Sequence, residues 1–177
     1  MSIILLATEK PFAKDAVAKI NQVITNAGHE MQLLENYTEK SAFIEAAKNV
    51  HAIIVRSDLV DAEVINAAPD LKIVVRAGAG FDNLDLAAAS SKNVVCMNTP
   101  GQNANAVAEC AFGMMLYMAR KQFSGSSGTE LRGKKLGIIG YGNFHYTFSA
   151  VIFVFSQGDF AHDGLNFPGF QSIYFFD

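Results

Sequence analysis

A short apolar segment that runs into a Gly-x-Gly sequence is the motif with the clearest chemistry. Residues 136–139 are Leu-Gly-Ile-Ile, and Gly140, Tyr141 and Gly142 follow directly. In a dinucleotide-binding fold the first glycine permits the tight turn after a strand, and the second lets the backbone approach a pyrophosphate. A third small residue is expected at position 145, but His145 stands there. The motif therefore begins as a phosphate-binding turn and then departs from it.

Three other predicted strands end on groups that suit an anionic ligand. Those groups are Arg56 with Ser57, Arg76 with Gly78-Ala79-Gly80, and Asn98 with Thr99. Guanidinium groups and the free N–H groups of a Gly-rich turn bind carboxylate or phosphate. Ligands of open α/β sheets bind beyond the carboxyl ends of the strands, so we predict a site for a small anionic acid there.

Each of these groups also has a plain structural interpretation. Arg56 is equally compatible with a surface salt bridge, and the two glycines with turn geometry alone. The segment 98–100 and Asn103 are also compatible with a turn and a helix N-cap. The three strand ends together favour a binding site more than any one of them does.

The remaining polar residues carry less information. No catalytic role is assigned to the four histidines, His29, His51, His145 and His162. Glu109 is interpreted as a helix-surface carboxylate, with a buried anchor or a subunit contact as alternatives. Methionines 114, 115 and 118 indicate core or interface packing. No metal site is predicted, because the sequence contains neither C-x-x-C nor a His/Cys cluster.

Composition limits the class of protein. The 177-residue chain has a net charge of -3, which gives no indication of a nucleic-acid or membrane partner. The apolar N-terminal segment is shorter than the roughly 7–15 residues of the apolar h-region of a signal peptide, and no segment reaches the ~18 apolar residues of a membrane span. Two cysteines in separate predicted elements suit a reducing compartment. We therefore expect a cytoplasmic protein.

Strands and helices alternate along the first 121 residues. Unbroken apolar segments predict strands, and apolar residues at helical spacing, such as Val17, Ile20, Val23 and Ile24, predict helices between them. Five such units predict an α/β fold, a parallel sheet with helices on both faces. The expected strands are 2–8, 31–34, 52–55, 71–75 and 94–97. We expect one helix with Pro11 in its first turn and a second that begins at the cap Ser41. A third helix runs over 62–68 after the cap Asp61, and two more cover 84–91 and 103–121.

The last 34 residues differ from the rest of the chain. They contain no Lys or Arg and nine of the fourteen phenylalanines, and their aromatic and β-branched residues form helices poorly. One interpretation is a specialised aromatic tail that binds a partner. The interpretation that we favour is a sequence unrelated to the preceding fold, such as a shifted reading frame, a mispredicted exon or a truncation.

The order of the motifs resembles the D-isomer-specific 2-hydroxyacid dehydrogenases, over residues 1 to about 143. The segments that carry the resemblance are 53–57, 72–85, 95–100, Asn103, Ala108-Glu109 and 128–138. Within the family they are most similar to the short members that oxidise 3-phosphoglycerate to 3-phosphohydroxypyruvate with NAD, the first step of serine synthesis.

The resemblance implies a domain organisation and a set of site residues. It implies a flavodoxin-like substrate domain over 1–101, a long helix and linker over 102–132, the first strand of a Rossmann domain over 133–143, and an irregular Phe-rich tail over 144–177. The implied substrate contacts are Arg56, Ser57, Arg76, Gly78 and Asn103. The implied NAD contacts are Ala79, Gly140, Tyr141, Gly142, Asn143 and Phe144. Family members are homodimers.

The departures from the family pattern bear on activity. The catalytic Arg, Glu and His of the family have no counterpart in this sequence, so no catalytic residue is assigned. We expect a truncated dehydrogenase that is inactive alone. The alternatives are a non-catalytic module that binds a small phosphorylated or carboxylic acid, and a protein that acts only through assembly. The sequence leaves open which 2-hydroxy acid is bound and whether NAD or NADP is preferred.

Overall fold

The computed structural model describes residues 1–132, 134, 136–137, 165–167, 170–173 and 175–176. The chain forms two compact units, Met1–Pro100 and Gly101–Asp177, and each is described by itself. The finer division at residues 101, 132 and 143 that the sequence suggests stays a prediction.

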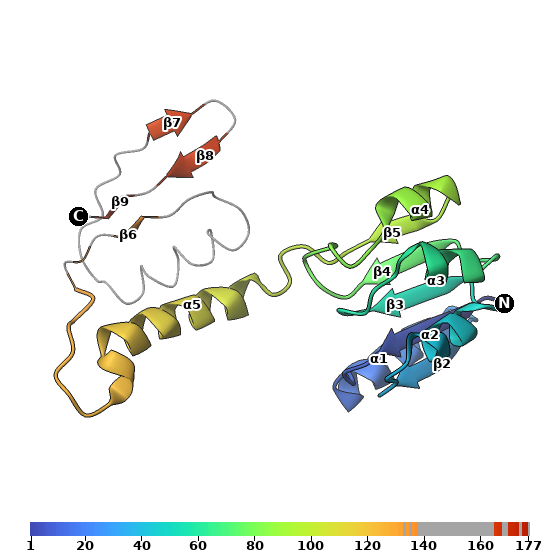
Figure 1. Cartoon of the computed structure of the whole chain (residues 1–177), viewed down its shortest axis with the longest axis horizontal. Helices are drawn as coiled ribbons and strands as arrows, with labels where there is room; N and C mark the ends of the chain where they lie inside the picture. The colour runs from blue at the N-terminus through green and yellow to red at the C-terminus, as the bar shows by residue number, and fades with distance from the viewer. Residues whose placement is uncertain (133, 135, 138–164, 168–169, 174, 177) are drawn as a thin grey trace. The chain divides into compact units, whose positions relative to one another are not determined.

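The first unit is built on a five-stranded parallel sheet (Figure 1). Its strands are β1 (Ile3–Thr8), β2 (Glu30–Glu35), β3 (Ala52–Val55), β4 (Ile73–Arg76) and β5 (Val95–Met97). Their order is β2-β1-β3-β4-β5, and every neighbouring pair is parallel. This is the flavodoxin-like order, so the predicted α/β class is confirmed.

Four helices connect these strands. They are α1 (Lys14–Asn26), α2 (Lys40–Ala47), α3 (Ala62–Ala67) and α4 (Leu86–Ser91). The chain moves toward one sheet edge through α1 and toward the other through α2, α3 and α4. Because such crossovers are right-handed, α1 lies on the opposite face from the other three. Helices α2, α3 and α4 form a row in which neighbours are in contact (Figure 1).

The core lies between the sheet and the row of three helices. Phe43 of α2 is 1% exposed, and Ile53, Val55 and Val74 of the facing strands are fully buried. Burying a side chain of this size contributes about 1.5–3 kcal/mol. On the other face the edge strand β5 leaves Val95 50% exposed. The core therefore depends mainly on one face of the sheet.

Two local predictions are wrong. Pro11 is not in the first turn of α1, which begins at Lys14; the N–H group of Phe12 instead bonds to the Glu35 carboxylate at 3.3 Å, which holds this segment as a loop. Ser41 is not a cap, because α2 already begins at Lys40 and has no side-chain cap. The helix that the apolar spacing predicts is confirmed as α1; Ile24 is buried in it, and Val23, ~100° around the helix, is 70% exposed.

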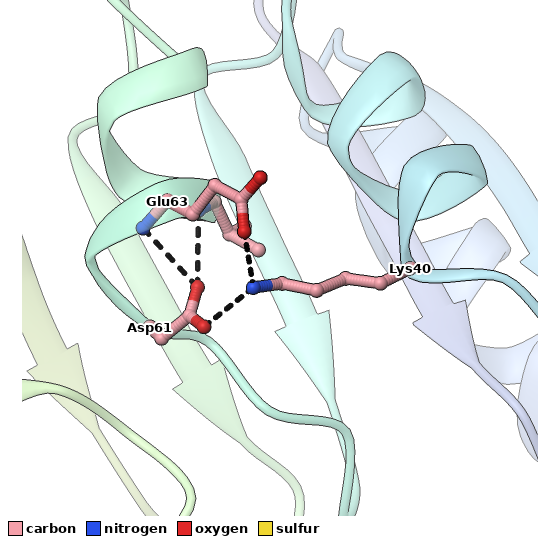
Figure 2. Close-up of polar contacts among 4 residues, drawn as sticks. Lys40, Asp61 and Glu63 are labelled. Atoms are coloured by element: carbon pink, nitrogen blue, oxygen red, sulfur yellow. Dashed lines mark hydrogen bonds and ion pairs between the residues drawn. The ribbon is translucent and has the colours of Figure 1, made fainter.

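The predicted cap Asp61 is confirmed, and it also holds two helices together. Its carboxylate accepts the N–H groups of Glu63 and Val64, both at 3.2 Å. The Lys40 ammonium at the start of α2 lies 2.6 Å from Asp61 and 2.6 Å from Glu63 (Figure 2). Burial raises the pKa of Asp61, but the bonds from Lys40 and from the two N–H groups outweigh it, so the pKa lies below its usual value.

The second unit begins with a long helix, α5 (Ala104–Ala119), followed by the short helix η1 (Lys121–Phe123). Lys121, Gln122 and Phe123 all have positive φ, which ends α5 two residues before the predicted residue 121. The chain then returns on α5: the Thr129 N–H group donates to the Ala119 carbonyl at 2.8 Å. A Cβ atom at Gly128 would lie 2.5 Å from that carbonyl, so this approach requires glycine.

Short strands complete the described part of this unit. They are β6 (Leu136–Gly137) paired antiparallel with β9 (Phe175–Phe176), and β7 (Leu165–Phe167) paired antiparallel with β8 (Phe170–Ile173). The Gly-x-Gly turn and most of the Phe-rich tail lie outside the described residues. Among the helices that are described, none has the length and apolar character needed to cross a membrane.

We predict that Asp61→Ala lowers the free energy of unfolding by about 1 kcal/mol at pH 7, because the first turn of α3 loses its cap. Since folding depresses the pKa of Asp61, its contribution is complete above the unfolded-state value of about 3.9 and is lost as the pH falls through the folded-state value. Urea unfolding at pH 7 and pH 3 measures both effects. Asp70→Ala, at an exposed position, is the control. An equal difference from wild type at both pH values would contradict the pH effect.

Candidate functional site

The carboxyl ends of the parallel strands lie at one edge of the sheet, which we call the carboxyl edge. From β1 the chain runs to β2 on one side and then returns to β3 on the other. Open α/β sheets bind ligands outside the point where the strand order reverses in this way. Glu9 follows β1, Arg56 follows β3, and Arg76 ends β4. The topology therefore brings the predicted residues Arg56, Ser57 and Arg76 to the same edge.

A buried carboxylate, Asp58, lies at the centre of this edge. Its side chain is 4% exposed and accepts the Glu9 N–H group at 2.7 Å and the Arg56 N–H group at 3.3 Å. It also accepts the Tyr37 hydroxyl at 2.7 Å. No Lys or Arg among the described residues forms an ion pair with it. Its negative charge is thus satisfied by three hydrogen-bond donors.

Tyr37 is held in its protonated form. Burial raises the pKa of its hydroxyl far above the usual value, and the hydrogen bond to Asp58 raises it further. The hydroxyl therefore remains a donor at every physiological pH. Its ring also packs against Phe43, with ring centroids 5.7 Å apart, which joins the carboxyl edge to the core.

Arg56 presents its side chain to solvent. Its guanidinium carbon lies 5.5 Å from the centroid of the Phe12 ring, a cation–π contact. Its main chain is bonded on both sides, by its N–H group to Asp58 and by its carbonyl to Arg76. Ser57, the next residue, is exposed. The guanidinium of Arg56 therefore rests on an aromatic ring while its backbone is fixed.

Arg76 folds back over the loop that follows it. Its Nε donates to the Arg56 carbonyl at 2.9 Å, and Nη1 donates to the Gly80 carbonyl at 3.1 Å. A Cβ atom at Gly78 would lie 2.5 Å from Nη1, so the guanidinium occupies the space that a side chain would need. A guanidinium has five N–H groups, so others remain for a ligand.

Asn83 joins the loops that follow β3 and β4. Its Nδ2 donates to the Asp58 carbonyl at 2.7 Å and to the Arg56 carbonyl at 3.3 Å. Its Oδ1 is buried without a hydrogen-bond partner among the described residues. The adjoining backbone pairs as well, because the Val60 N–H group donates to the Asn83 carbonyl at 2.9 Å.

The loop with the predicted nicotinamide neighbour, Ala79, is tied to the end of β5. Asn98 donates from Nδ2 to the Ala79 carbonyl at 2.8 Å, and the Thr99 N–H group donates to the Gly78 carbonyl at 2.9 Å. Asn98 and Thr99 therefore support the glycine-rich loop with their polar groups.

The remaining predicted residues belong to the second unit. Asn103 belongs to the second unit and occupies the N-cap position of α5, but its side chain makes no capping bond. Glu109 is exposed and accepts from Asn105 Nδ2 at 2.8 Å. The predicted NAD contacts Gly140, Tyr141, Gly142, Asn143 and Phe144 fall outside the described residues. Among the described residues there is no cluster of His, Cys, Asp or Glu that could hold a metal ion.

Two histidines lie at the amino ends of the strands, opposite the carboxyl edge. Nδ1 of His29 accepts the Ser2 N–H group at 3.3 Å, and Nδ1 of His51 accepts the Ile3 N–H group at 3.1 Å. Both therefore support the start of β1, away from the carboxyl edge. Sequence reasoning assigned them no catalytic role, but it missed Asp58, Tyr37 and Asn83; the only local signal was an acidic residue directly after Arg56-Ser57.

Comparison with known proteins identifies the family. Residues 5–164 match the family model of the D-isomer specific 2-hydroxyacid dehydrogenase catalytic domain. The chain belongs to this family. The match extends past residue 143, where the sequence motifs depart from the family pattern. The family comprises oxidoreductases that act on 2-hydroxy acids.

Individual relatives carry different names. Over 167 residues the chain is 34% identical to hydroxypyruvate reductase of Thermotoga maritima, covering 86% of this chain and 53% of that protein. It is 35% identical to D-3-phosphoglycerate dehydrogenase of Rattus norvegicus, covering 83% and 30%. NAD+-bound 3-phosphoglycerate dehydrogenase of Entamoeba histolytica has a similar structure, with 44% identity, a TM-score of 0.84, and coverage of 88% and 51%. The chain thus spans about half or less of the length of these relatives.

We predict that Gly78→Ala displaces the Arg76 guanidinium without unfolding the protein. The new methyl group meets the end of a flexible side chain, so Arg76 can move and lose its bond to the Arg56 carbonyl. The expected loss of stability is about 1 kcal/mol or less, the value of one hydrogen bond. The NMR signal of the Arg76 Nε–H group measures the displacement.

Gly113→Ala is the matched control, because a Cβ atom there meets nothing within 4 Å. An Arg76 Nε–H signal that is unchanged in Gly78→Ala would contradict the prediction.

Proposed function

We propose that the chain recognises a small anionic 2-hydroxy acid, 3-phosphoglycerate, for NAD-dependent oxidation to 3-phosphohydroxypyruvate. One observation carries the proposal: Arg76 donates to the main chain of Arg56, so two guanidinium-bearing residues are joined at the carboxyl edge beside the reversal of strand order. A ligand with a carboxylate and a phosphate presents two groups that guanidinium binds through paired hydrogen bonds. Ser57 and the loop at Gly78, through the N–H groups of Ala79 and Gly80, are proposed to complete the contacts, and Asn103 is proposed to join them; the N–H groups of Ala77 and Gly78 already donate to the Val55 and Arg76 carbonyls.

The choice of acid rests on the family. Two of the relatives described above are named phosphoglycerate dehydrogenases, and one is named hydroxypyruvate reductase. Two separate guanidinium groups favour a ligand with two anionic groups over one with a single carboxylate. This favours 3-phosphoglycerate as the first acid to test, with glycerate as the comparison.

NAD is proposed as the cofactor, held by Ala79 and by the Gly140–Phe144 turn. The support is the Gly-x-Gly sequence and the E. histolytica relative, which has NAD+ bound. When bound, NAD would supply the acceptor for the hydride that leaves the hydroxyl-bearing carbon. The hydroxyl proton needs an acceptor within hydrogen-bond reach. Both described histidines bond to the start of β1 instead.

That placement favours a second candidate function, a module that binds the acid without turning it over. We propose that the chain alone binds 3-phosphoglycerate and does not oxidise it. Two measurements on the purified chain separate the candidates. Isothermal calorimetry with 3-phosphoglycerate measures binding, and NADH absorbance with NAD present measures turnover.

Binding without NADH formation above a no-protein control supports the module. NADH formation would show that groups beyond the described residues supply the proton acceptor. Absence of heat with 3-phosphoglycerate at millimolar concentration would refute acid recognition by this chain.

A homodimer is also proposed. On α5, Met114 and Met118 are 58% and 66% exposed, which supports the interface alternative for these two methionines. A second copy of the helix would bury them. Sedimentation velocity of the chain tests this, and a monomer at all concentrations would refute it.

We predict that Arg56→Gln weakens 3-phosphoglycerate binding about tenfold to a hundredfold, because a charge-assisted contact contributes about 1.5–3 kcal/mol. Lys72→Gln is the control. It removes the same charge from an exposed position at the amino end of β4, away from the carboxyl edge. Calorimetry at low and moderate salt measures both. Equal weakening by the two variants would show that net charge, not Arg56, attracts the acid.

A further inference from the structure

Asp58 has an environment that stability alone does not explain. It is a carboxylate with 4% exposure and no ion pair among the described residues. Burying a charge in this way is costly unless every hydrogen-bonding position is used. An apolar residue of similar size would avoid that cost. A buried carboxylate at this position therefore indicates a role other than stability.

The donors come from three different strand ends. Glu9 follows β1, Tyr37 follows β2 and Arg56 follows β3. A fourth strand end is connected through the backbone carbonyl of Asp58, to which Asn83, in the loop after β4, donates at 2.7 Å. One residue thus connects the ends of four strands at the edge where we place the acid.

Two of these bonds determine the position of Arg56. Asp58 holds its N–H group directly. Asp58 also holds the N–H group of Glu9, and the segment from Glu9 leads within three residues to Phe12, the ring under the Arg56 guanidinium. The backbone of Arg56 and the start of the segment that carries its aromatic support are therefore bonded to the same carboxylate.

We propose that Asp58 is a positioning residue that orients Arg56 toward the anionic group of the acid. The inference rests on the proposed function for the ligand, but the placement of Arg56 is independent of it. Loss of the carboxylate removes acceptors from the N–H groups of Glu9 and Arg56, at the ends of two different strands. Because recognition of an anion by guanidinium depends on direction, affinity falls even if the sheet remains folded.

The chain contains a matched control for this residue. Asp61 also accepts two backbone N–H groups and one side-chain donor, namely those of Glu63, Val64 and Lys40. Its bonds hold the start of α3 and none of the strand ends that Asp58 joins. Asp58→Asn and Asp61→Asn therefore remove one charge each from carboxylates with the same number of partners.

The test measures 3-phosphoglycerate binding by calorimetry and unfolding in urea for the chain and both variants. We expect Asp58→Asn to raise the dissociation constant at least about tenfold, and Asp61→Asn to change it less than about twofold. A similar loss of affinity in both variants, in proportion to their loss of stability, would overturn the proposal. If Asp58→Asn does not fold, Asp58→Glu replaces it, since it keeps the charge but moves the carboxylate by one methylene.

A second readout needs no ligand. We expect amide hydrogen exchange of Glu9 and Arg56 to be slow in the wild-type chain and in Asp61→Asn. In Asp58→Asn we expect it to be fast at one or both amides, because they bond to different oxygens of Asp58 and asparagine keeps only one acceptor oxygen. If the wild-type chain does not bind 3-phosphoglycerate, the proposed function fails while this readout still decides whether Asp58 places Arg56. Unchanged exchange at both amides in Asp58→Asn would refute the positioning role.

Discussion

The bonds made by Asp58 are the interaction on which the candidate site depends. Where a parallel sheet ends, backbone N–H and carbonyl groups leave the ladder and need other partners. In this unit the buried carboxylate of Asp58 accepts hydrogen bonds from the residues after β1, β2 and β3. The backbone carbonyl of Asp58 accepts another from Asn83, in the loop after β4. The carboxyl edge is therefore held in one arrangement by hydrogen bonds, while the apolar core below it is made by Phe43 and the strands it covers.

The two arginines at this edge have different relations to the protein. Arg76 uses Nε and Nη1 to hold the carbonyls of Arg56 and Gly80, and it depends on the absence of a side chain at Gly78. The guanidinium of Arg56 lies over the Phe12 ring and forms no hydrogen bond with the backbone of the described residues. One arginine thus shapes the loop and the other is available to a ligand. This division of roles explains how the two arginines are placed although neither forms an ion pair with a described acidic residue.

Family membership and local structure support each other at the level of the fold. The match to the 2-hydroxyacid dehydrogenase model covers most of the chain, and the sheet order agrees with a ligand site at the β1/β3 reversal. The relatives are named after different acids, so the substrate is a proposal that rests on the family and on the charges at the carboxyl edge. The chain covers about half or less of the relatives described above, so the whole enzyme's activity also stays a proposal.

The sequence by itself determined the alternation of strands and helices, the parallel sheet, the Asp61 cap and the family. These follow from apolar segments, from spacing within one helix or strand, and from short motifs, all of which are local. It did not predict Asp58, Tyr37 or Asn83, and it misplaced Pro11 and Ser41. Only the tertiary structure decided these, because the bonds concerned join residues far apart in the chain, such as Glu9 with Asp58 and Lys40 with Asp61. No local spacing reveals such pairs until the fold brings the strand ends together.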